Sequence, residues 1–200
     1  MTTERKRYHD RAVRALRELR NEKARFGSIR DGSGRRYRVG VYFLLAGEHE
    51  RAEAAFEWCY REFPDDAGDP IFHLYGVLSA HRDGRADLAQ SRLLDALVSN
   101  IFLLPSLTGQ VIDAEGIWRS SNWADEAHLR DVAEFLDEPT TEERAWIAAA
   151  LSTNAFRSIS AGYIDTYRQL AVERDYAKRR AILANWNTLQ GKCRTQVRES

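Results

Sequence analysis

The residue types that could carry metal or acid–base chemistry are few in this sequence and form no ligand pattern. The five histidines are His9, His49, His73, His81 and His128. His73 and His81 are eight residues apart and so share one face of a helix. No cysteine or carboxylate pattern accompanies them, as a zinc site would require. We therefore expect neither a bound metal nor a cofactor.

Other reactive residue types also lack a catalytic arrangement. The acidic turn of Asp65, Asp66 and Asp69 does not have the spacing of a calcium loop, which favours a solvated turn. Cys59 and Cys193 are not in C-x-x-C spacing, which argues against a disulfide framework or a zinc site. There is no G-x-S-x-G, no H-E-x-x-H and no phosphate-binding glycine loop. The sequence contains no recognisable set of catalytic residues, so we expect a protein that is not an enzyme.

Length and composition favour one folded domain. A chain of 200 residues can bury a core without disulfides. No segment is apolar over the length that a membrane span needs, and the basic N-terminus is not followed by the apolar core of a secretory signal. We expect a cytoplasmic protein that does not bind a membrane. The excess of Arg over Lys is typical of a GC-rich bacterial genome.

The net charge of zero hides a segregation of charge along the chain. Residues 1–38 carry 13 Lys and Arg against 5 Asp and Glu, residues 39–150 carry 8 against 21, and residues 151–200 carry 9 against 4. The basic ends could follow a phosphate backbone through Arg5, Lys6, Arg7, Lys178, Arg179 and Arg180. Few aromatic residues that could stack on bases lie among them. The alternative is that the basic helices neutralise the acidic middle of this domain or of a neighbouring subunit.

The elements that must position these residues are helical, beginning with residues 34–66. Apolar residues recur there at helical spacing in two segments, which predicts helices near 36–46 and 49–63. Gly47 separates the two segments and Pro64 ends the second. Two helices joined by so short a turn must pack as an antiparallel pair. Gly40 and Ala52 allow close approach of the two backbones, and Phe56 fills the seam between them.

This hairpin resembles the tetratricopeptide repeat (TPR), a helix–turn–helix unit of roughly 34 residues. The residues at the family's spacing are Gly40, Phe43, Gly47, Ala52, Phe56, Cys59 (where the family usually has Ala) and Pro64. The large aromatic residue usual near the start of the first helix is displaced, with Arg36 in its place and Tyr37 beside it. The resemblance implies a bacterial TPR-like protein that binds other proteins.

A second repeat is expected at 70–82 and 85–99, because Ala89, Leu93 and Ala96 follow Gly84 at the family's spacing. Residues 100–109 resemble a segment that closes the last repeat in some bacterial TPR proteins, and an acidic helix is then expected within 116–139. Two repeats are too few to bury their faces, so flanking helices must cap them.

The remaining expectations complete an all-α fold of two TPR-like hairpins capped by N- and C-terminal helices. We expect a helix over 4–26 and a loop over 27–34. Thr140 and Glu143 form a capping box before the next helix, followed by a break at 158–162 and one long helix over 163–189. The expected domains are a basic helix and loop (1–33), two repeats (34–110), C-terminal capping helices (111–190) and a frayed tail (191–200).

The inner face of a TPR array is lined by the first helix of each repeat. In this chain the expected partner-binding residues there are Tyr37, Val41, Leu44, Leu45, Leu74, Leu78 and His81, and the expected rim is acidic. Such a face fits an amphipathic helix with flanking Arg or Lys. The chain's own helices could instead fill it, or a second copy could, forming a homo-oligomer. The expected function is a protein-binding adaptor, and the alternative is a helical protein that associates with nucleic acid through its basic ends.

Overall fold

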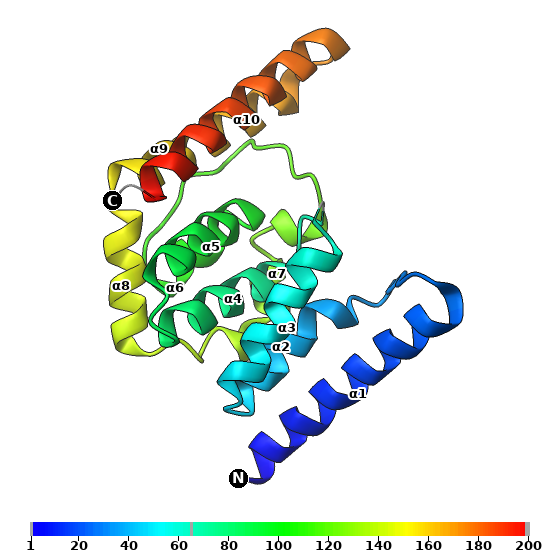
Figure 1. Ribbon diagram of the computed structural model, residues 1–200. Coiled ribbons are helices and arrows are strands. Elements are labelled where there is room, and N and C mark those ends of the chain that lie inside the picture. The colour runs from blue at the N-terminus through cyan, green and yellow to red at the C-terminus, as the bar shows by residue number, and fades with distance from the viewer. Residues whose placement is uncertain (1, 65, 199–200) are drawn as a thin grey trace. The chain divides into compact units, whose positions relative to one another are not determined.

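The computed structural model describes residues 2–64 and 66–198, and all the regular secondary structure within them is helical (Figure 1). The elements are α1 (Thr3–Phe26), α2 (Arg35–Leu45), α3 (His49–Glu62), α4 (Pro70–Arg82), α5 (Ala86–Ser99), α6 (Leu103–Leu107), η1 (Asn122–Ala124), α7 (His128–Asp131), η2 (Ala133–Phe135), α8 (Thr141–Leu151), α9 (Asn154–Val172) and α10 (Tyr176–Arg198). The all-α fold class is confirmed. The chain divides into two compact units, residues 1–89 and 90–200.

In the first unit, α2 is the central helix because it packs against α1, α3 and α4 (Figure 1). Its core side chains, Val39 and Phe43 among them, are buried. The sequence-based bounds 4–26, 36–46, 49–63, 70–82 and 85–99 agree with α1 to α5 within one or two residues.

Local chemistry explains these helix ends. Gly27, directly after α1, has φ of +73°, and its N–H donates to the Lys23 carbonyl. At α4, the Asp69 carboxylate accepts from the backbone N–H groups of Ile71 and Phe72 while Pro70 takes the first helical position, where its missing N–H costs nothing.

Close packing of α2 against α3 depends on a glycine. A Cβ atom built on Gly40 would lie only 2.8 Å from Cε1 of the buried Phe56 ring. An added side chain would therefore force the Phe56 ring to move. Helix α2 thus packs closely on α3 where Gly40 meets Phe56, whereas the role of Ala52 and the pairing of α4 with α5 stay predictions.

In the second unit, α9 and α10 pack side by side (Figure 1). The capping box predicted before α8 is confirmed: Thr140 Oγ1 accepts from the Glu143 N–H, and the Glu143 carboxylate accepts from the Thr140 N–H. Trp186 is buried between these helices, where its ring and the Tyr163 ring form a T-shaped pair, whereas Trp118 and Trp123 are partly exposed.

The helix expected within 116–139 was wrong. The segment instead forms the short elements η1, α7 and η2. The buried Asn100 side chain donates to the backbone carbonyls of Trp123 and Asp125. The Arg144 guanidinium donates to the carbonyls of Leu107, Leu136 and Pro139. The carbonyls of Trp123, Asp125 and Leu136 lie within the segment, and a continuous helix would direct them along its own axis.

Two further boundaries differ from the sequence-based ones. The break expected at 158–162 lies inside α9, and the single helix expected over 163–189 is interrupted at residues 173–175. Gly162 lies within α9 at the contact with α10, where a Cβ atom would lie 2.1 Å from Leu189 Cδ2. The frayed tail expected over 191–200 is helical to Arg198, since Cys193 and Val197 are buried.

Candidate functional site

The partner-binding residues expected on the inner face are mostly inaccessible. Those that are buried are Tyr37, Val41, Leu44, Leu74 and Leu78, while Leu45 and His81 are half-buried. They lie on α2 and α4, which pack against each other. A partner could reach the buried ones only after the covering segments had moved.

An open apolar depression lies elsewhere in the first unit, between α1 and α3. We name it the α1–α3 groove. It has a volume of about 340 Å³ and is lined by Leu16, Arg20, Lys23, Ile29, Phe43, Arg51, Ala54, Ala55 and Trp58. Phe43 of α2 is 1 % exposed and forms the floor, while the half-buried Leu16 and Trp58 stand on opposite walls.

Helix geometry brings these residues together. Leu16, Arg20 and Lys23 are spaced by four and three residues and so share one face of α1. Arg51, Ala55 and Trp58 have the same spacing on α3. The two alanines keep the α3 wall low, so the groove is not filled by the chain's own side chains.

The groove is bordered by positive charge, because its lining includes three cationic side chains and no carboxylate. The Arg51 guanidinium lies 4.1 Å from the Phe43 ring centroid and 2.6 Å from Glu48 Oε2. Lys23 pairs with Glu62. Arg20 is exposed and forms no hydrogen bond or ion pair with the described part of the chain. Arg20 is thus the cation at this rim that is available to a ligand.

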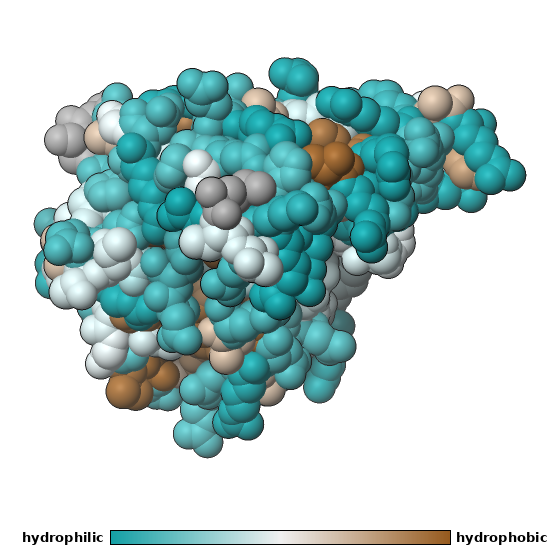
Figure 2. Space-filling view, turned by 90° about the horizontal axis from the view of Figure 1, so that it is seen from below, coloured by the Kyte–Doolittle hydropathy of each residue, from teal (hydrophilic) through white to brown (hydrophobic). Residues whose placement is uncertain are grey.

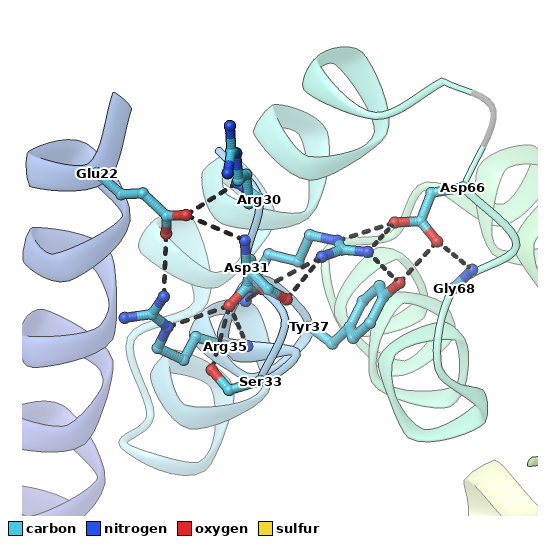
Figure 3. Close-up of polar contacts among 9 residues, drawn as sticks. Glu22, Arg30, Asp31, Ser33, Arg35, Tyr37, Asp66 and Gly68 are labelled. Atoms are coloured by element: carbon cyan, nitrogen blue, oxygen red, sulfur yellow. Dashed lines mark hydrogen bonds and ion pairs between the residues drawn. The ribbon is translucent and has the colours of Figure 1, made fainter. Parts of the chain in front are cut away.

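A second candidate is the polar cluster at the start of α2 (Figure 3). Asp31 is 2 % exposed and accepts from the backbone N–H groups of Arg35 and Arg36, at 2.9 and 2.8 Å. The Arg36 guanidinium bridges Asp31 and Asp66, and the Tyr37 hydroxyl donates to Asp66 Oδ1 at 2.6 Å.

The contacts of Asp66 and Tyr37 in this cluster shift the pKa values of both groups. Burial alone would raise the pKa of Asp66, but hydrogen bonds from Tyr37 and the Gly68 N–H, with the charge of Arg36, hold that pKa below its ordinary value. Burial and the bond to Asp66 raise the pKa of Tyr37. The carboxylates of Asp31 and Asp66 are both paired inside the cluster. The cluster therefore fastens the loops around residues 31 and 66 to α2 and offers no free acid or base.

Cys59, Cys193 and His73 are also in structural roles. Burial raises the pKa of Cys59 to about 12 and also raises that of Cys193, so neither is a thiolate nucleophile at neutral pH. His73 is buried, with Nε2 2.7 Å from the Ala67 carbonyl oxygen. In residues 2–64 and 66–198, no three His, Cys, Asp or Glu side chains gather as metal ligands.

The basic residues expected for nucleic-acid binding belong to the two different units. Arg5, Lys6 and Arg7 are exposed on α1. Arg179 is occupied in the turn between α9 and α10, where its guanidinium donates to the carbonyls of Leu170 and Glu173. Its neighbour Lys178 lies 4.0 Å from Glu173, and Arg180 is exposed.

Sequence reasoning missed the α1–α3 groove. It gave Trp58 no role. The available signal was Trp58 itself, a large aromatic residue beside the stripe of Ala52, Phe56 and Cys59 instead of within it.

Surface hydrophobicity elsewhere is scattered. On the face shown in Figure 2, hydrophobic residues form small patches separated by hydrophilic side chains. Among the described residues, no helix combines the length and apolar character that crossing a membrane requires. Comparison of the chain with protein-family models, with curated proteins and with solved structures gave no match.

Proposed function

We propose that this chain is a non-enzymatic, TPR-like adaptor that binds a protein partner in the α1–α3 groove. The observation that carries the proposal is the groove itself: about 340 Å³ of solvent-open space with a Phe43 floor and walls that include Leu16 and Trp58. Apolar anchors inserted into such pockets dominate the energetics of many protein interfaces. The resemblance of residues 34–66 to a TPR hairpin supports the same class of function.

The proposal moves the binding surface away from the inner face of the repeats. All but one of the apolar residues of α2 and α4 expected there are buried and so serve the core; Leu45 is half-buried. The α1–α3 groove keeps an accessible aromatic residue, Trp58, beside small residues that leave space for a partner. Tryptophan is among the residues most enriched in interface hot spots.

The test is affinity capture from native lysate with the groove filled by substitution. Ala54→Trp places a large ring at the exposed edge of the groove, and Ala24→Trp places the same ring on an exposed position of α1 outside it. We expect a protein captured by wild type and by Ala24→Trp to be lost from Ala54→Trp. Equal capture by all three, with circular dichroism showing that each is folded, would remove the groove from the proposal. The absence of any specifically captured protein would overturn the adaptor function.

A further inference from the structure

The residues that line the α1–α3 groove restrict which class of protein segment can bind there. At about 340 Å³, its volume is at the lower end of the roughly 300–1,000 Å³ of ligand pockets. It can take one or two apolar side chains but cannot enclose a whole helix. The remainder of a bound segment must therefore lie along the rim.

The rim determines which charges that segment can carry. Arg20, Lys23 and Arg51 border the groove, and no Asp or Glu belongs to its lining. Lys23 and Arg51 are partly neutralised by Glu62 and Glu48, which lie outside the lining. Arg20 has no partner in the described chain. Its guanidinium could bind a carboxylate with two parallel hydrogen bonds, whereas a basic segment would meet like charge.

We propose that the occupant is an acidic peptide segment, with one or two large apolar side chains in the groove and flanking Asp or Glu residues on Arg20, Lys23 and Arg51. The inference rests on the proposed protein-binding function and names the partner's chemistry. The inferred partner has the opposite charge to the one expected from the sequence, where an acidic rim around the inner face favoured a basic amphipathic helix. The expected charge of the partner changes because α1, the most basic helix of the first unit, forms one wall of the groove.

The test uses fluorescence anisotropy of the full chain with three labelled short peptides. All share a central Leu-Phe pair and an amidated C-terminus, so a terminal carboxylate cannot contribute. The flanking residues are Asp and Glu, Ser and Gly, or Lys and Arg. We expect the acidic peptide to bind at least about tenfold more tightly than the neutral one, because charge complementarity favours it, and the basic peptide not to bind.

Variants locate the binding. Ala54→Trp should abolish it, since the new ring occupies the groove. Arg20→Glu should weaken the affinity for the acidic peptide by about tenfold or more, because it reverses a charge at a rim contact. The same variant should allow the basic peptide to bind. The matched control is Arg17→Glu, an equal charge reversal at an exposed α1 position that does not line the groove; it should change affinity by less than about twofold. Circular dichroism of each variant verifies folding.

Several results would overturn the inference. These are equal binding of the neutral or basic peptide, equal effects of Arg20→Glu and Arg17→Glu, or binding that survives Ala54→Trp. Occupation by something else would do the same: dodecanoate or a short DNA duplex bound in place of the acidic peptide, or a dimer in light scattering that Ala54→Trp dissociates. If captured proteins depend on the groove while the acidic peptide fails, this inference falls and the adaptor function stands; if neither depends on it, both fall.

Discussion

At the scale of single residues, Asp31 shows how one buried side chain can determine where a helix begins. Its carboxylate accepts from two backbone N–H groups in the first turn of α2 and pairs with Arg35 and Arg36. Its own backbone has φ of +34°, a conformation that Asp tolerates better than most residues. The loop before α2 is thereby fixed to the helix that holds the groove floor.

Replacing Asp31 should be costly. Asp31→Ala leaves two helix N–H groups without their acceptor and removes one carboxylate partner from each of Arg35 and Arg36, so we expect the free energy of unfolding to fall by about 2–3 kcal/mol. Asp31→Asn keeps an acceptor oxygen and should lose less. Urea denaturation measures both. Asp10→Ala, an exposed carboxylate on α1, is the control and should stay within about 0.5 kcal/mol of wild type; a similar result for Asp31→Ala would show that the loop is held by other contacts.

Asp66 should make stability depend on acid. Its pKa in the folded chain lies below the ordinary 3.8, so its ionised form stabilises the fold above that pH, and the contribution is lost as pH falls through the lowered pKa. We expect wild type to exceed Asp66→Asn in unfolding free energy at neutral pH and the difference to shrink below pH 3.8. Asp10→Asn provides the comparison. A constant difference from pH 7 down to the acid transition would contradict the assignment.

At the scale of elements, the pairing of α2 with α3 and that of α9 with α10 each use a glycine for close approach. Gly40 faces the Phe56 ring and Gly162 faces Leu189, with no room for an undisturbed Cβ at either. The α2–α3 pair also fixes the groove, because α2 supplies its floor and α3 supplies the Trp58 wall. A change in their separation should therefore alter both stability and the groove.

A glycine-to-alanine pair of variants tests this packing. Gly40→Ala forces the Phe56 ring to move, and we expect a loss of about 1–3 kcal/mol in unfolding free energy. Gly191→Ala, on α10 where nothing lies within 4 Å of the added Cβ, should instead stabilise the chain by about 0.5–1 kcal/mol. Thermal denaturation followed by circular dichroism gives both signs. If the two variants melted alike, close approach would not be the reason for Gly40.

The same elements show what sequence could and could not predict. Helices α2 to α5 were located within one or two residues because Gly47, Pro64, Pro70 and Gly84 mark their ends locally. Gly162 in the same way predicted a helix break, at 158–162, yet it lies inside α9. Its packing partner is Leu189, on a helix later in the chain, so the local sequence does not reveal its role. The irregular segment after residue 116 follows likewise from distant partners, Asn100 and Arg144. The groove was not predictable from periodicity because it exists only where α1 approaches α3.

At the scale of the whole molecule, the N-terminal helix links stability to the proposed binding. Helix α1 buries Leu19 and stacks Tyr8 on Tyr42 of α2. Its Glu22 accepts hydrogen bonds from the backbone N–H groups of Arg30 and Asp31. The same helix forms one wall of the groove and supplies Arg20. Removing it should therefore affect the fold and the ligand site together.

Deletion of residues 1–30 tests this coupling. The truncated chain exposes Tyr42 and Phe43, so we expect it to bind a hydrophobic dye, to melt at lower temperature and to lose the acidic peptide. Full-length Leu19→Ala keeps both groove walls while removing buried apolar volume, so it should lose about 2–5 kcal/mol of stability but still bind the peptide under native conditions. Light scattering of both proteins shows whether α1 packs on its own chain or on a second copy. If α1 were exchanged between two chains, truncation would halve the mass of the dimer.

Three results together would contradict this coupling: unchanged melting, no dye binding and intact peptide affinity after truncation. They would show that α1 neither covers α2 nor contributes to the site. The exposed residues of the α9–α10 hairpin, Val172 and Tyr176, would then be the next surface to mutate.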